Sequence, residues 1–115
     1  MSLWLVAINP HSGNGRGSVV ASRVTAFLDR KNVAYHIIAA GSAAALSQEL
    51  TSELESRKFT GVISVGGDGL AHLVMQLCVP RHLPFAVVPA GTGNDFVRTL
   101  GWSLENIEPF LNKLI

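Results

Sequence analysis

Continuous apolar runs alternate along this chain with segments whose apolar residues recur every three or four positions. The continuous runs lie at residues 3–8, 34–40, 62–65 and 85–88, and they predict four β-strands. Almost uninterrupted apolar character is typical of strands that are buried on both faces of a parallel sheet. Strands that alternate with helices predict a three-layer α/β/α sandwich with a mostly parallel sheet.

The segments between the runs have helical spacing. Each predicted helix begins at or near one of these residues: Ser18, Ser42, Gly69, Asn94 and Ser103. Ser18 is expected to cap the first helix with its side chain. In the second helix Glu53 and Arg57 stand four residues apart, which predicts an ion pair on the helix surface.

Glycine is concentrated directly after three of the predicted strands. Eight of the eleven glycines fall within residues 9–17, 66–69 and 89–96. Because parallel strands end along one edge of the sheet, these three segments are expected to converge there. Backbone N–H groups without a neighbouring Cβ suit a phosphate chain, so the pattern predicts a nucleotide-phosphate site.

Composition narrows the class of protein. At 115 residues and 48% apolar content the chain predicts one domain with an adequate core, and a net charge of +1 argues against nucleic acid as a partner. No apolar run approaches the ~20 residues needed to cross a bilayer. Cys78 is the sole cysteine; it excludes a disulfide framework, fits a cytoplasmic location, and is expected to be a buried thiol. The four histidines show no metal-ligand spacing.

Two common nucleotide-binding motifs do not fit. A P-loop requires a glycine followed by lysine, and no glycine here precedes a lysine. The first glycine segment follows the dinucleotide-binding fingerprint only loosely, and no acidic residue suited to a ribose stands at the end of the second strand.

Taken together, the three glycine segments resemble the catalytic domain of the diacylglycerol kinase family, which also includes sphingosine, ceramide and bacterial lipid kinases. The family pattern is N-P-x-S-G-x-G, G-G-D-G and P-x-G-T-x-N-D-F. It is matched, in order, by NPHSGNG at residues 9–15, GGDG at 66–69 and PAGTGNDF at 89–96. The resemblance implies an NAD kinase/diacylglycerol kinase-like fold, ATP and Mg²⁺ as cofactors, and transfer of the γ-phosphate to the hydroxyl of a diacylglycerol- or sphingosine-like lipid.

The resemblance also implies a set of site residues. Those expected to bind the nucleotide are Asn9, Pro10, Ser12, Gly13, Gly66, Gly67, Asp68, Gly69, Gly91, Thr92 and Gly93. Asp68 is the expected catalytic residue, either holding Mg²⁺ or accepting the proton of the attacking hydroxyl, because phosphate would otherwise repel a carboxylate. Alternatives remain open: Asp68, Asn94 and Asp95 as helix caps, and Arg16 and Arg98 as solvated side chains rather than phosphate ligands.

Two residues depart from the family pattern. Leu70 stands where most members carry threonine, and Leu73 replaces a usual glutamate. With His72, Leu70 is closer to the G-D-G-L-x-H-E pattern of the sphingosine kinase branch. The two leucines favour one rival interpretation, a non-catalytic nucleotide-binding module. The second rival, an NAD kinase-like enzyme, shares only the GGDG motif.

Family members usually continue into a second, mostly β domain that binds the lipid. We therefore expect residues 1–115 to be the N-terminal nucleotide-binding domain alone, with the lipid-binding domain absent. On this interpretation the isolated chain is inactive, and peripheral membrane contact would come with the lipid substrate.

Overall fold

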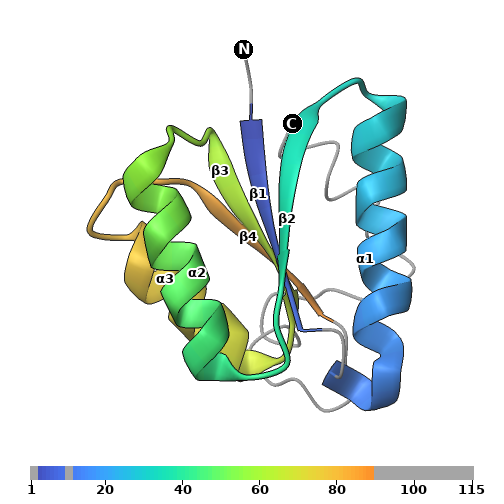
Figure 1. Ribbon diagram of the computed structural model, residues 1–115. Coiled ribbons are helices and arrows are strands. Elements are labelled where there is room, and N and C mark those ends of the chain that lie inside the picture. The colour runs from blue at the N-terminus through green and yellow to red at the C-terminus, as the bar shows by residue number, and fades with distance from the viewer. Residues whose placement is uncertain (1–2, 10–11, 90–115) are drawn as a thin grey trace.

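The computed structural model in Figure 1 describes residues 3–9 and 12–89. Strands and helices alternate in the order β1 (Leu3–Ile8), α1 (Ser12–Arg30), β2 (Ala34–Ala39), α2 (Ala43–Ser56), β3 (Gly61–Gly66), α3 (Asp68–Cys78) and β4 (Phe85–Pro89). All four predicted strands are confirmed. The helices predicted near Asn94 and Ser103, and residues 90–96 of the third glycine segment, lie outside the described residues.

The four strands form one fully parallel sheet in the order β2-β1-β3-β4. Ile8 is in register with Ala39 on one side and with Val65 on the other, and Gly66 is in register with Pro89. The carboxyl ends of the strands therefore lie along one edge. Helix α1 covers one face, while α2 and α3 cover the other (Figure 1). The predicted three-layer sandwich is confirmed.

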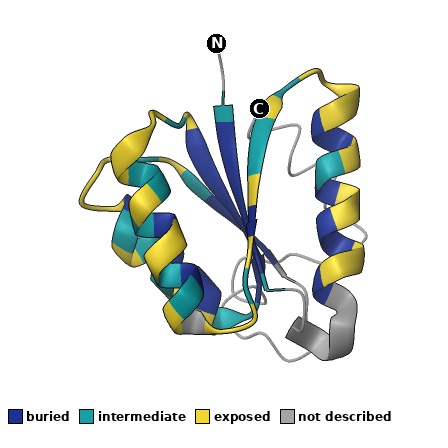
Figure 2. Ribbon diagram, viewed as in Figure 1, coloured by how far each residue is buried: buried dark blue, intermediate teal, exposed yellow. Residues whose placement is uncertain are grey.

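Each face of the sheet has its own apolar core. On the α1 face, Val24 and Leu28 pack with Val6 and Ile63. On the opposite face, the buried residues include Leu5, Leu46, Leu50, Val62, Leu70 and Val74. Figure 2 shows the consequence: β1 and β3 are buried almost throughout, whereas β2 at the margin is largely not. The central strands read as continuous apolar runs because both of their faces are covered.

The predicted start of the first helix was wrong. Helix α1 begins at Ser12, so much of the expected glycine loop forms the first turns of a helix. Ser18 lies inside this helix, exposed, and its carbonyl accepts a hydrogen bond from the Ser22 hydroxyl at 3.0 Å. A glycine costs only about 1 kcal/mol in a helix, and packing of the apolar stripe against the sheet decides where helices form.

The structure adds one cap that was not predicted and confirms two local predictions. The Ser42 hydroxyl accepts a hydrogen bond from the Ala45 N–H at 3.2 Å and caps α2. Arg57 and Glu53 form the expected ion pair at 3.1 Å. Cys78 is fully buried, and burial raises the pKa of its thiol to about 11, so the thiol stays protonated and unreactive near neutral pH.

Candidate functional site

The sheet changes its winding direction between its two central strands. From β1 the chain passes through α1 on one face to β2, and from β3 it passes through α3 on the other face to β4 (Figure 1). A crevice at the carboxyl ends of two such strands is where open α/β sheets bind ligands. Here the Asn9 N–H donates a hydrogen bond to the Val65 carbonyl at 3.0 Å and joins the two strand ends. Two of the three glycine segments therefore start side by side.

The turn from β3 into α3 consists of one residue. Gly67 has extended backbone angles (φ −93°, ψ −168°) and occupies the N-cap position, where its carbonyl accepts the N–H of Ala71 at 3.1 Å. The first amides of a helix have no acceptor within that helix, and they form the positive end of its dipole. Helix α1 starts at Ser12, soon after the end of β1, on the opposite face of the sheet from α3.

The glycines of the second segment provide space rather than unusual backbone angles. A Cβ on Gly66 would lie 2.9 Å from Leu70 Cδ2 and 3.4 Å from Asn9 Cβ. Glycine is thus needed at position 66 for β1, β3 and α3 to approach one another. Gly69 differs, because a Cβ there would meet no atom within 4 Å, which leaves the start of α3 open to an approaching ligand.

Asp68 is the most unusual polar residue of this edge. It is the first residue of α3, and its Oδ1 is buried with no hydrogen-bond partner among the described residues. The alternative that Asp68 caps the helix is wrong, since Gly67 holds the cap position and no side chain makes a cap hydrogen bond. Leaving a buried acceptor unpaired costs about 1–3 kcal/mol, and the favourable position of a carboxylate in the first turn of a helix offsets only part of that cost.

A cavity of about 170 Å³ opens next to this helix start, lined by Asn9, Ala40, Ser42, Leu46, Gly67, Gly69, Leu70 and Leu73. Its walls therefore come from the ends of β1 and β2 and the starts of α2 and α3. Leu70 is buried and Leu73 half-buried, and both pack into the core of the α2/α3 face. The two departures from the family pattern are thus core residues that also give the cavity an apolar wall.

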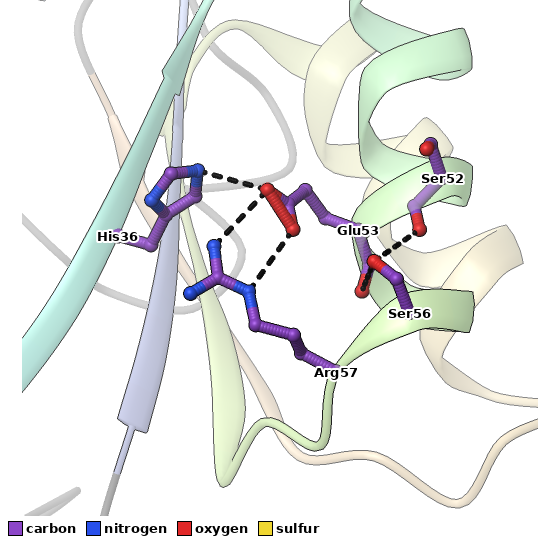
Figure 3. Close-up of polar contacts among 5 residues, drawn as sticks. All are labelled: His36, Ser52, Glu53, Ser56 and Arg57. Atoms are coloured by element: carbon purple, nitrogen blue, oxygen red, sulfur yellow. Dashed lines mark hydrogen bonds and ion pairs between the residues drawn. The ribbon is translucent and has the colours of Figure 1, made fainter.

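A larger cavity, about 600 Å³, lies elsewhere, between β2 and α2. Beside it, His36 Nε2 lies 3.1 Å from Glu53 Oε1, and Arg57 bonds both oxygens of the same carboxylate, Nη2 to Oε1 at 3.1 Å and Nε to Oε2 at 3.2 Å (Figure 3). The hydrogen bonds from Arg57 are the main reason that the pKa of Glu53 is lowered. The sequence analysis missed His36, because its contact depends on how β2 packs against α2.

The predicted site residues divide into two groups. At the carboxyl edge of the described sheet lie Asn9, Ser12, Gly13, Gly66, Gly67, Asp68 and Gly69. Outside the described residues lie Pro10, Gly91, Thr92 and Gly93, as do Asn94, Asp95 and Arg98.

Within residues 3–9 and 12–89, no three His, Cys, Asp or Glu side chains gather closely enough to hold a metal by themselves. None of the helices described in this range has the length and apolarity to cross a bilayer.

Comparison with solved structures shows the same fold. A diacylglycerol kinase from Bacillus anthracis str. Sterne superposes with a TM-score of 0.70 over 97% of this chain and 42% of that one, at 24% sequence identity.

Curated relatives include a diacylglycerol kinase from Mycobacterium tuberculosis, 31% identical over 85% of this chain. A sphingosine kinase 1 from Caenorhabditis elegans is 30% identical over 81%. The chain spans 31% and 22% of the lengths of these two relatives. Residues 3–115 match the diacylglycerol kinase catalytic domain. The chain therefore belongs to the diacylglycerol kinase catalytic domain family.

Proposed function

We propose that this chain is the nucleotide-binding part of an ATP-dependent lipid kinase that phosphorylates a diacylglycerol- or sphingosine-like hydroxyl. The observation that carries the proposal is the unpaired Asp68 Oδ1 at the N-terminus of α3, in the crevice between β1 and β3. Membership of a kinase family, with relatives named diacylglycerol kinase and sphingosine kinase, supports it.

The phosphate chain of ATP would lie across the ends of β1 and β3. The amides of Gly67, Asp68 and Gly69 would contact it from one side, and those of Ser12 and Gly13 from the other. Backbone amides at helix starts suit this role, since their donors and their dipoles both favour an anion. Gly91, Thr92 and Gly93 would complete the contacts from the segment that follows β4. The apolar wall of Leu70 and Leu73 offers a surface for the flat purine ring.

Asp68 distinguishes this site from a simple anion-binding site, because it adds a carboxylate where phosphate is expected to bind. A carboxylate close to triphosphate is strongly repelled unless a cation or a proton lies between them. Mg²⁺ commonly takes only one or two carboxylates and completes its shell with water and phosphate oxygens, so a single unpaired carboxylate fits it. Asp68 would hold the ion, which when bound neutralises charge on the β- and γ-phosphates.

The second role for Asp68 is that of a general base. As the lipid oxygen bonds to the γ-phosphorus, the bond from that phosphorus to the bridging oxygen of ADP breaks, and ADP leaves. The proton of the lipid hydroxyl would pass to Asp68 Oδ1, the oxygen that has no partner among the described residues. Catalysis of this kind rests chiefly on positioning and charge neutralisation.

The curated relatives are longer than this chain. Because the chain spans 31% of its Mycobacterium tuberculosis relative, we propose that the acceptor lipid binds mainly to a second domain. The chain of residues 1–115 would then bind nucleotide without turning over lipid. A cytoplasmic protein that meets its substrate at the membrane surface, with no nucleic acid partner, is consistent with this proposal.

Titration of the chain with ATP, with and without Mg²⁺, tests the nucleotide site. We expect saturable, Mg²⁺-dependent binding that Asp68→Asn weakens by about tenfold or more, equivalent to the ~1.4 kcal/mol that one tenfold step represents. Glu55→Gln removes an exposed carboxylate on α2 and serves as the matched control. If ATP binding loses its dependence on Mg²⁺ in Asp68→Asn but not in Glu55→Gln, Asp68 holds the metal ion. Equal, unaltered binding by both variants would leave only the general-base role for Asp68.

Burial of Leu70 and Leu73 in the core favours one second candidate, a module that binds nucleotide without catalysis. Phosphate transfer by the longer protein to diacylglycerol, sphingosine and NAD, measured side by side, separates the candidates. Transfer to a lipid supports the kinase, transfer to NAD supports an NAD kinase-like enzyme, and no transfer despite tight ATP binding supports the non-catalytic module.

A further inference from the structure

Helix α3 has two flanks of different character. On the flank toward α2, Leu73 packs into the same apolar core as Leu46 and, together with it, lines the cavity of about 170 Å³. On the flank toward β4, Ala71 is buried together with Val87. The start of α3 therefore separates an apolar cavity from the side of the sheet on which β4 ends.

Asp68 and His72 follow the second flank. Residues three or four positions apart lie on the same face of a helix, so Asp68 shares the side of Ala71, and His72 adjoins Asp68 one turn later. The Cβ atoms of such a pair are about 5–6 Å apart. Asp68 is half-buried, whereas His72 is exposed. The two side chains thus form a polar strip that leads from the first turn of α3 toward solvent.

The position of His72 directs its side chain toward the first turn of α3. Side chains on a helix lean toward its N-terminus, so a residue covers the surface of the turn that precedes it. For His72 this surface includes Gly69, where an added Cβ would meet no atom within 4 Å. An imidazole N–H, which is a hydrogen-bond donor, therefore lies above an open stretch of backbone whose first amides have no acceptor within the helix.

The two flanks give the bound nucleotide a direction, on the basis of the function proposed above. With the purine in the apolar cavity on the α2 flank, the phosphates cross the start of α3 at Gly67 and Gly69. The last phosphate then reaches the β4 flank. We propose that His72 binds this γ-phosphate by donating a hydrogen bond from its ring N–H to a phosphoryl oxygen, beside Asp68.

An imidazole suits this place for a chemical reason. A hydrogen bond to a phosphate oxygen is charge-assisted and stronger than one between neutral groups, and a donor beside Asp68 offsets part of the repulsion between its carboxylate and the phosphate. Leu73 is the next residue in the chain but belongs to the other flank. Its departure from the family pattern therefore bears on the purine rather than on the phosphate that is transferred.

Titration of the chain with ATP, ADP and AMP in the presence of Mg²⁺ tests the role of His72. His72→Ala should weaken ATP binding about tenfold or more, the usual scale for a hydrogen bond to a charged group. Binding of ADP and AMP should stay the same, because neither carries a γ-phosphate. His72→Gln retains an N–H donor and should recover part of the ATP affinity. Gln76→Ala is the matched control, since Gln76 is exposed one turn further along α3.

The outcomes separate the role of His72 from the proposed function. Normal ATP binding with an unchanged ratio of ATP to ADP affinity in His72→Ala would overturn the role of His72 and leave the nucleotide site in place. Equal weakening of all three nucleotides would also overturn it. If the unmodified chain binds none of them, both the proposed function and the role of His72 are wrong. Circular dichroism and melting temperature verify that these variants of exposed residues fold.

Steady-state kinetics of the longer kinase provide a second measurement. His72→Ala should lower kcat/KM for ATP at least about tenfold, while the inhibition constant of ADP stays the same. A residue that merely supports the fold would change both quantities together. An unchanged kcat/KM, or a parallel loss of ADP inhibition, would remove His72 from the γ-phosphate.

Discussion

Two carboxylates lie on helices beside cavities in this molecule, and their surroundings are opposite. Glu53 on α2 is bound by His36 and Arg57 next to a cavity of about 600 Å³. Asp68 begins α3, whose start borders a cavity of only about 170 Å³, and its buried Oδ1 has no partner among the described residues. The site that we propose therefore rests on an unpaired buried carboxylate oxygen rather than on the size of a cavity.

The difference arises because the polar groups belong to side chains at one edge and mostly to the backbone at the other. At the outer edge they belong to side chains, which are long enough to find one another, as His36, Glu53 and Arg57 do (Figure 3). At the carboxyl edge they belong mostly to the backbone at helix starts, and a helix cannot satisfy its own first amides. The carboxyl edge is therefore left with donors that a ligand could use, whereas the side chains of the outer cluster already satisfy one another.

The largest expected effect comes from Asp68. In the longer kinase, Asp68→Asn should lower kcat by at least about 10²-fold, the usual span for a lost general base being 10²–10⁴. The melting temperature should stay the same or rise, because the substitution removes an unpaired buried carboxylate. Steady-state kinetics and a thermal melt of the same preparation measure both, with Glu55→Gln, which removes an exposed carboxylate of α2, as the control. Near-normal turnover in Asp68→Asn would remove Asp68 from the mechanism.

Two of the three glycines of the second segment, Gly66 and Gly69, should respond to substitution in opposite ways. Gly66→Ala places a Cβ 2.9 Å from Leu70 Cδ2, and overpacking of this kind costs about 1–3 kcal/mol of unfolding free energy. Gly69→Ala meets no atom and should raise the unfolding free energy by up to about 1 kcal/mol, because alanine favours a helix. Urea denaturation measures both changes, and equal destabilisation would contradict this distinction.

ATP binding by Gly69→Ala tests whether the phosphate chain approaches the start of α3. The added methyl group would stand where the proposed phosphate chain approaches the start of α3, so weaker binding should accompany the unchanged or higher stability. Unaltered ATP affinity would move the phosphate chain away from this helix start.

The smallest effect is expected at the outer edge and depends on pH. The pKa of Glu53 is lowered in the folded chain, chiefly by hydrogen bonds from Arg57. Its contribution to stability is therefore present above the pKa of an unfolded glutamate, about 4.3, and is lost as the pH falls through the lower folded value. Glu53→Gln should flatten this part of the dependence of melting temperature on pH, while Glu55→Gln should leave it unchanged. Parallel curves for all three proteins would contradict the assignment.

The sequence by itself determined the four strands, the parallel three-layer fold, the start of α2 near Ser42 and the pair of Glu53 with Arg57. Each of these follows from hydrophobic periodicity or from neighbours within one helical turn. Such features depend on residues that are close in sequence, so the sequence alone predicts them. The family motifs likewise predict that the candidate site lies at the carboxyl edge.

Only the tertiary structure decided the rest. It placed the start of α1 at Ser12, because packing against the sheet outweighs the low helix propensity of glycine. It also showed that Gly67 rather than Asp68 caps α3, that Asp68 Oδ1 is buried without a partner among the described residues, and that His36 reaches Glu53. These facts depend on which elements lie side by side, and contacts between residues distant in sequence leave no periodic signal in the chain.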